Sequence, residues 1–235
     1  MCGRYSITNT TEAYRRLFSF DDLTGLQPRY NLAPTQMAPV IRERDGARHL
    51  DMLRWGLLPK WSKDESEGAK MINARSETIA EKPAFRDAFR TRRCLVPADG
   101  FYEWQARGKT KKPFRIARRD GEAFAFAGLW ESWVNPNVSP INRPNDNHAT
   151  VDTYTIATVV ASPAIAHIHY RMPVILVPED HHAWLRGDPA QALSLLRPLP
   201  DAELQSFEVS PRVGDIRNDD ASLMAPCQER EPTLF

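Results

Sequence analysis

Apolar and polar residues alternate along several stretches of this chain, which is the pattern of half-buried β-strands. Strands are predicted at residues 38–43, 48–55, 93–98, 113–119, 123–130, 153–160 and 173–178. Four other stretches predict short helices, at residues 11–20, 81–91, 178–187 and 200–207. Thr10 or Thr11 supplies the expected N-cap of the first helix, and prolines stand near the start of the second and the last.

The order of these elements indicates the fold class. Strands dominate, and the helices lie between them without a βαβ rhythm, so we expect an α+β fold with a mainly antiparallel sheet. The segment 135–149 is rich in Asn and Pro and predicts a loop excursion between two strands. Residues 228–235 are expected to form a flexible tail, and residues 1–235 to form a single domain.

Composition narrows the class of protein further. The chain has 235 residues, of which 42% are hydrophobic and 26% charged, with a formal net charge of +1. No apolar run approaches the length of a membrane-spanning helix, and the N-terminus lacks the apolar stretch of a secretory signal. Three cysteines, at positions 2, 94 and 227, do not make a disulfide framework. We therefore expect a cytoplasmic protein with no membrane partner.

The most unusual feature is a cysteine directly after the initiator methionine, in "MCGRYS". If Met1 is removed, Cys2 carries both a free α-amine, with a pKa of about 7.7–8, and a thiol, with a pKa of about 8.5. Both groups are partly available as nucleophiles near neutral pH. The alternative is that the first residues fray and Cys2 has no role.

Three polar residues elsewhere complement this nucleophile. Asn73 lies in "INARSE", Glu103 in "PADGFYEW" and His169 in "HIHYRMPVIL". Each alone is explained by a turn, a solvent-facing strand or a helix end. Together they supply an amide, a carboxylate and an imidazole, the groups expected for covalent chemistry at a carbonyl. No Cys or His spacing predicts a metal site, and no glycine-rich loop predicts a nucleotide, so no cofactor is expected.

A basic run extends from residue 107 to residue 119, with seven Lys or Arg and no acidic residue. Such a run is either a solvated face or a nucleic-acid contact.

The order of the motifs points to one family. "MCGRY", "RYNLAPTQ", "WGLLPKW", "INARSET", "RRCLVPADGFYEW", "PFRI", "FAGLWE", "HYRMPVIL" and "VSPRVGDIRND" follow one another along nearly the whole chain. In this ordered set the chain resembles the SRAP family, the SOS response-associated peptidase-like proteins that process abasic sites in single-stranded DNA. The resemblance implies a barrel-like sheet.

The resemblance also implies a reaction for Cys2. Removal of Met1, autocatalytic or by an aminopeptidase, would expose the α-amine. The amine would attack the aldehyde of the ring-opened abasic deoxyribose to form a Schiff base. The thiol would then close a thiazolidine ring, giving a DNA–protein crosslink that shields the lesion in the DNA damage response. A weak AP lyase activity and a thiol autopeptidase activity are implied as well.

The same resemblance assigns residues by position. Cys2, Asn73, Glu103 and His169 are the implied catalytic residues. The implied DNA-binding residues are Arg4, Asn31, Pro34, Trp61, Arg75, Ser76, Thr158 and Arg171. Pro34 and Trp61 match a wedge that stacks on bases, although Ser62 stands where some members have a second tryptophan. The implied partner is single-stranded DNA with abasic sites, either plain or at junctions with double strand, bound by a monomer at the nucleoid.

Two other function classes begin from the same residues. An N-terminal-nucleophile amidohydrolase of the glutaminase type also starts with Met-Cys-Gly and uses the thiol against an amide. A cysteine peptidase acting on other proteins is a related alternative. A non-catalytic DNA-binding module would use the basic and aromatic residues but leaves four residues unexplained, Cys2, Asn73, Glu103 and His169.

Overall fold

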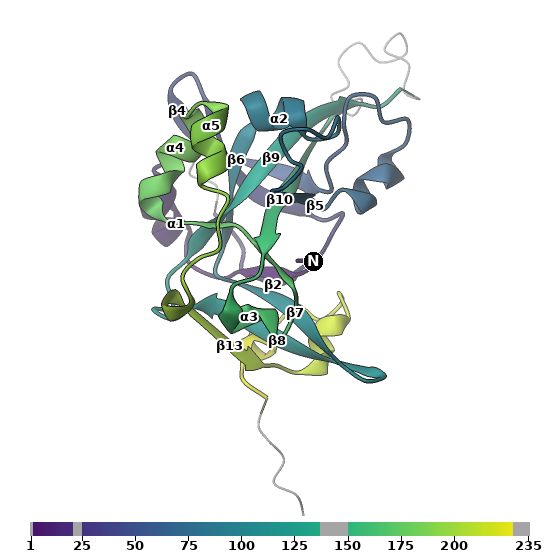
Figure 1. Cartoon of the computed structure of the whole chain (residues 1–235), viewed down its shortest axis with the longest axis vertical. Helices are drawn as coiled ribbons and strands as arrows, with labels where there is room; N and C mark the ends of the chain where they lie inside the picture. The colour runs from purple at the N-terminus through teal and green to yellow at the C-terminus, as the bar shows by residue number, and fades with distance from the viewer. Residues whose placement is uncertain (1, 21–24, 137–149, 228–235) are drawn as a thin grey trace, which may run out of the picture.

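The computed structural model describes residues 2–20, 25–136 and 150–227, which form two β-sheets with short helices around them (Figure 1). The strands are β1 Tyr5–Ile7, β2 Arg29–Leu32, β3 Met37–Arg44, β4 Ala47–Trp55, β5 Asn73–Arg75, β6 Arg93–Ala98, β7 Gly100–Arg107, β8 Thr110–Arg118, β9 Phe124–Val134, β10 Thr150–Val160, β11 Arg171–Pro173, β12 Ile175–Leu176 and β13 Leu204–Glu208. The α-helices are α1 Thr11–Phe18, α2 Arg86–Thr91, α3 Pro163–Ala166, α4 His181–Arg186 and α5 Pro189–Ser194.

The larger sheet closes on itself as a barrel. β10 pairs with β4, which pairs in turn with β3, then β6, then β9, and β9 returns to β10. All of these pairings are antiparallel except that of β4 with β10. Asp45 and Gly46 connect β3 to β4 with φ values of 50° and 81°, the backbone of a tight hairpin turn. The predicted α+β fold with a barrel-like, mainly antiparallel sheet is confirmed.

The second sheet has the order β13-β8-β7-β1-β2. β1 joins it through antiparallel pairing with β7, in which Tyr5 lies opposite Phe101. One cluster of buried apolar side chains contains residues of both sheets, among them Tyr5 of β1 and Tyr154 of β10. Their hydroxyl groups lie 2.6 Å apart inside this core. The core therefore ties the first strand of the chain to the barrel.

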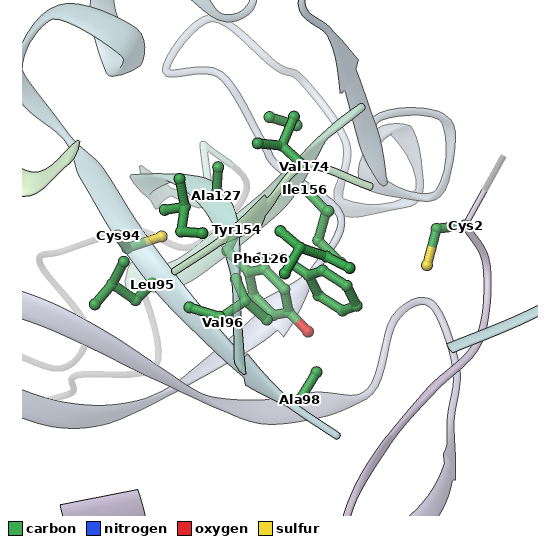
Figure 2. Close-up of a cluster of buried hydrophobic side chains, with 14 of the residues drawn as sticks. Cys2, Cys94, Leu95, Val96, Ala98, Phe126, Ala127, Tyr154, Ile156 and Val174 are labelled. Atoms are coloured by element: carbon green, nitrogen blue, oxygen red, sulfur yellow. The ribbon is translucent and has the colours of Figure 1, made fainter. Parts of the chain in front are cut away.

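Cys2 lies at the margin of this cluster, across from Cys94 in the view of Figure 2. Both cysteines are fully buried, whereas Cys227 is exposed. No disulfide joins the three.

Most of the predicted elements are present with shifted ends. The predicted strand at residues 93–98 coincides with β6, and Thr10 caps α1 by accepting the Ala13 N–H. The prediction of one strand over residues 173–178 was wrong, since β12 holds only Ile175–Leu176. The helix predicted over 81–91 is confined to its last turns, α2, and the one over 178–187 consists of a 3₁₀ turn followed by α4.

The predicted helix at residues 200–207 was wrong. A single 3₁₀ turn, Asp201–Glu203, leads into β13, which pairs with β8 along its whole length. Backbone pairing with an open sheet edge therefore overrides the helical pattern of "PDAELQSF". The expected loop at 135–149 stands between β9 and β10, and the last residue of β9, Val134, pairs with the first residue of β10, Thr150. Its residues 137–149, like the expected tail at 228–235, lie outside the described residues.

Within the described ranges, no helix has both the length and the apolar composition needed to cross a membrane.

His181 of α4 makes the fold sensitive to acid. Its ring is 1% exposed and stacks on Phe18 of α1 at a centroid distance of 5.3 Å. Burial, and then the charge of Arg48, lowers the pKa of His181 from 6.5 to about 4. Between these two values the unfolded chain binds more protons than the folded one, so stability is complete above pH 6.5 and falls as the pH drops through 4.

We expect His181→Leu to remove this dependence. The wild-type chain should lose about 3 kcal/mol of unfolding free energy through this group as the pH falls to about 4, at ~1.4 kcal/mol per pKa unit. Urea unfolding at neutral and acidic pH measures the loss, which should be smaller in the variant by that amount. Its exposed neighbour His182, changed to Gln, is the matched control and should keep the full acid loss.

Candidate active site

The site is built around Cys2, immediately before β1. Its thiol is fully buried and donates to the carbonyl of Arg4 at 3.8 Å. Burial raises the pKa of this thiol well above its ordinary value, and the charge of Glu103 raises it further. The thiol is therefore held protonated, and it requires a base before it can act as a nucleophile.

Asn73 contacts the backbone of Cys2. It opens β5, which runs parallel to β10 and places Asn73 opposite Ile156. Its side-chain NH₂ donates to the carbonyl of Cys2 at 2.8 Å. This bond fixes the backbone of the second residue of the chain, so Asn73 positions the nucleophile.

Glu103 approaches Cys2 from β7. The pairing of β1 with β7 sets Tyr5 opposite Phe101, and continuing the register brings Glu103 beside the residues that precede β1. The carboxylate is 3% exposed, and its charge acts on the Cys2 thiol. A buried carboxylate at this position is suited to proton transfer.

His169 completes the group from the segment between α3 and β11. Nδ1 of the imidazole lies 3.0 Å from the Arg171 backbone nitrogen and 3.1 Å from the Arg171 carbonyl oxygen, so Arg171 orients the ring. The exposed ring of Tyr170 stacks on the imidazole, with centroids 4.6 Å apart. These contacts hold the imidazole at the edge of the site.

Two of these residues, Glu103 and His169, line a cleft. Its volume is about 400 Å³, and it is lined by Glu103, Trp104, Lys111, His169 and Gly214. Asn73 contacts Cys2, Glu103 acts on Cys2 electrostatically, and Glu103 and His169 share the cleft. The structure thus brings together four residues that lie 30 to 167 positions apart in the chain. A nucleophile, a buried carboxylate and an imidazole beside an open cleft can carry out covalent chemistry on a carbonyl compound.

A comparison with known proteins decides the family. A family model described as SOS response associated peptidase (SRAP) matches residues 1–216. The chain belongs to the SRAP family.

Named relatives align with this SRAP protein over nearly its whole length. It is 38% identical over 231 residues to abasic site processing protein YoqW of Bacillus subtilis, covering 95% of this chain and 99% of that protein. It is 31% identical over 236 residues to abasic site processing protein YedK of Escherichia coli, covering 96% and 100%. It is 30% identical over 275 residues to abasic site processing protein HMCES of Gallus gallus, covering 97% of this chain and 78% of that protein.

Solved structures share the fold. A protein from Bacteroides thetaiotaomicron superposes with a TM-score of 0.80 at 25% identity, covering 96% of this SRAP chain and all of that one (100%). A protein from Bordetella bronchiseptica gives a TM-score of 0.75 at 28% identity, covering 89% and 100%.

Some residues predicted to bind DNA are accessible in this SRAP protein. Trp61 is 57% exposed, Arg75 is exposed and Pro34 is half-buried. Thr35, next to Pro34, has a φ of 70°, which is strained for a β-branched residue, and its N–H is held by the carbonyl of Trp55 at 2.8 Å. Strain of this kind is found at binding sites, and it fixes the direction in which Pro34 projects.

Arg4 and Ser76 are partly buried. The Arg4 guanidinium donates to the carbonyl of Gly3 at 2.9 Å, and burial lowers its pKa. The Ser76 N–H donates to the carbonyl of Thr158 at 2.9 Å. Ser62 is 3% exposed and its carbonyl accepts from the Trp133 indole, so the exposed aromatic of this loop is Trp61 alone.

Two of the predicted DNA ligands are buried within the fold instead. Thr158 is 0% exposed on β10. Arg171 is 4% exposed, makes a bidentate ion pair with Glu77 at 2.7 and 3.0 Å, and donates to the Thr158 carbonyl at 2.5 Å. Both side chains are therefore engaged in contacts within the fold. Arg171 instead fixes the segment that carries His169.

Asn31 is likewise 0% exposed. Its side-chain NH₂ donates to the carbonyls of Val213, Asp215 and Asn218 at 3.1, 3.1 and 2.9 Å. The amide therefore holds the 213–218 segment, which carries Gly214, a wall of the cleft. Asn31 supports the site from inside.

We expect Asn31→Ala to lower the unfolding free energy by about 2 kcal/mol, because the side-chain NH₂ has two N–H bonds to donate and each buried hydrogen bond is worth about 1 kcal/mol. Urea denaturation measures this loss. Asn218→Ala removes exposed side-chain bonds only, one to the Arg212 carbonyl and one from the Arg212 guanidinium, and serves as the matched control with a smaller effect. Equal losses in the two variants would contradict the role assigned to Asn31.

The sequence analysis did not assign four of the residues that line or flank the cleft, namely Trp104, Lys111, Gly214 and Tyr170. Lys111 belongs to the basic run at 107–119, and the other three stand in the quoted family motifs, which gave them no role. Throughout the described part of the chain, no three His, Cys, Asp or Glu side chains gather closely enough to hold a metal ion.

Proposed function

We propose that this SRAP protein binds abasic sites in single-stranded DNA and crosslinks to them through Cys2. The observation that carries the proposal is the placement of Cys2 against Asn73 and Glu103, at a cleft that Glu103 shares with His169. Relatives that match the chain over most of its length are named abasic site processing proteins, which supports the same substrate.

In the proposed reaction, both bonds to the sugar are made by Cys2, the first residue of the mature chain. Removal of Met1, by the protein itself or by an aminopeptidase, frees the Cys2 α-amine. The amine adds to the C1′ aldehyde of the opened deoxyribose, and loss of water leaves an imine. The thiol sulfur then bonds to the imine carbon while its proton passes to the nitrogen, which closes a thiazolidine ring. No oxidant, metal or cofactor is consumed.

The raised thiol pKa supports an order of events in which the amine reacts first. A protonated, buried thiol does not compete for the aldehyde, and it closes the ring once the imine is held beside it. Glu103 would transfer protons in imine formation and ring closure. His169 would give a proton to the sugar or hold the adjacent phosphate, and Asn73 would hold the Cys2 backbone in place.

The accessible candidates define the proposed DNA contacts. Arg4, Arg75 and Ser76 would bind backbone phosphates, while Pro34 and Trp61 would stack against bases at the lesion. Such contacts give affinity without reading sequence, and stacking is worth about 1–3 kcal/mol per base. We propose that a monomer acts in the cytoplasm at the nucleoid, on plain single strands or at junctions.

The test is incubation of the purified protein with a single-stranded oligonucleotide containing one abasic site. We expect an adduct that survives heat and SDS, and an intact protein mass without Met1. An unmodified oligonucleotide, and one whose abasic aldehyde has been reduced with borohydride, should give none. Release of ammonia from glutamine without any DNA adduct would favour the amidohydrolase instead.

A further inference from the structure

The basic run at residues 107–119 is divided by the structure into two groups. Four of its seven cationic side chains are occupied within the fold. Arg115 pairs with Asp99, Arg118 with Asp120 and Lys112 with Glu208, while Arg119 donates to the carbonyls of Ala202 and Leu204. These four hold β8 to its neighbours, and they are not available to a ligand.

The other three, Arg107, Lys109 and Lys111, gather at the tip of the β7–β8 hairpin. All three are exposed, and no carboxylate of residues 2–20, 25–136 or 150–227 forms an ion pair with them. Arg107 donates to the neutral Gln105 side chain and so keeps its charge uncompensated. Figure 1 shows this hairpin projecting beyond the rest of the second sheet. The tip therefore carries three positive charges into solvent.

Lys111 connects this tip to the active site. It lines the same cleft as Glu103 and His169, while the register of the hairpin sets Ala106 opposite Lys111 and Arg107 opposite Thr110. From Lys111 the exposed cations continue outward along the hairpin and away from Cys2. Arg107 and Lys109 stand on either side of Gly108, which has a φ of 59° in the tight turn of the hairpin.

We propose that Lys111, Lys109 and Arg107 form a phosphate-binding track along which one flank of the DNA strand leaves the cleft. This inference rests on the proposed function and specifies which surface the strand follows. Lys111 would hold the phosphate nearest the lesion, since it alone of the three lines the cleft. Exposed ammonium and guanidinium groups are typical ligands of phosphodiesters, and they bind independently of sequence.

Salt dependence tests the track separately from the chemistry. The probe is a single strand with a tetrahydrofuran abasic analogue, which has no aldehyde and so measures non-covalent binding. We expect Lys111→Gln to reduce the slope of log K against log salt concentration by about 0.7, and the triple Gln variant at 107, 109 and 111 by about 2. Lys111→Arg, which keeps the charge, should retain the wild-type slope.

Arg90→Gln is the matched control, since Arg90 is exposed on α2, away from the β7–β8 hairpin in Figure 1. It should leave the slope unchanged. A triple variant with the wild-type slope would overturn the track, and a reduced slope in the triple but not in Lys111→Gln would overturn the role of Lys111.

Free 2-deoxyribose separates the two proposals, because it offers the aldehyde without any phosphate. Its addition to Cys2, followed by protein mass, should occur in the wild type and to the same extent in the Arg90→Gln control. Failure of the wild type to react with deoxyribose or with abasic DNA would count against the crosslinking function. The salt slopes would still report on the track in that case.

Discussion

Cys2→Ala should abolish the heat-resistant adduct with abasic single-stranded DNA. The variant keeps an α-amine after loss of Met1, so an imine can still form, but no thiol is present to close the ring. Cys2→Ser should behave similarly, because a hydroxyl is a much weaker nucleophile than a thiol. For both variants we expect adduct only after borohydride trapping, and a loss of at least about 100-fold without it.

Two controls sharpen this prediction. Cys227→Ser removes the exposed thiol and should crosslink as the wild type does. A glycine inserted between Met1 and Cys2 keeps the thiol but separates it from the terminal amine, and it should also abolish the stable adduct. A heat-resistant adduct that persists in Cys2→Ala would refute the thiazolidine mechanism. Gel electrophoresis under denaturing conditions, with and without borohydride, distinguishes these results.

Glu103→Gln is expected to slow crosslinking by about 10²–10⁴-fold, the usual contribution of a positioned acid–base group. The amide has nearly the shape of the carboxylate, so binding to the tetrahydrofuran analogue should change little. Single-turnover crosslinking rates measure the effect. The exposed Glu122, changed to Gln, is the matched control and should react at the wild-type rate.

Glu103→Gln should also change the pKa of the Cys2 thiol, and in a direction that makes the thiol more reactive. Glu103 raises the pKa of Cys2 through its charge, so its removal should lower that pKa and shift thiol alkylation toward lower pH. A thiol that ionises more readily in a variant that crosslinks more slowly would separate proton transfer from simple thiol reactivity. An unchanged alkylation profile would contradict the electrostatic coupling between the two residues.

Periodicity predicted the longer strands well. The stretches at 93–98 and 153–160 alternate or are continuously apolar because their side chains fill the barrel, and they appear as β6 and part of β10. Short strands without a full period were not predicted. β1, β2 and β5 have three or four residues each, and pairing with a neighbour, rather than local pattern, makes them strands.

Motifs identified residues that matter without distinguishing their roles. Asn31 stands in the same motif as Pro34, and Arg171, like Arg75, stands in another motif of the family, yet Asn31 and Arg171 are buried. The two groups look alike in sequence, because an Asn or Arg side chain can bind either a phosphate or a backbone carbonyl. Burial decides between these partners, and burial depends on segments more than 80 residues away for Asn31 and Arg171.

The sequence by itself determined that a thiol follows the initiator methionine, that the ordered motifs are those of the SRAP family, and that strands dominate the fold. These are properties of residue identity and local pattern. Only the tertiary structure decided that Asn73 holds the Cys2 backbone and that burial and Glu103 keep the thiol protonated. It also decided that three of the seven cations in one run form no ion pair with the described part of the chain. Such facts depend on desolvation and on distances across paired strands, which arise only when distant segments pack together.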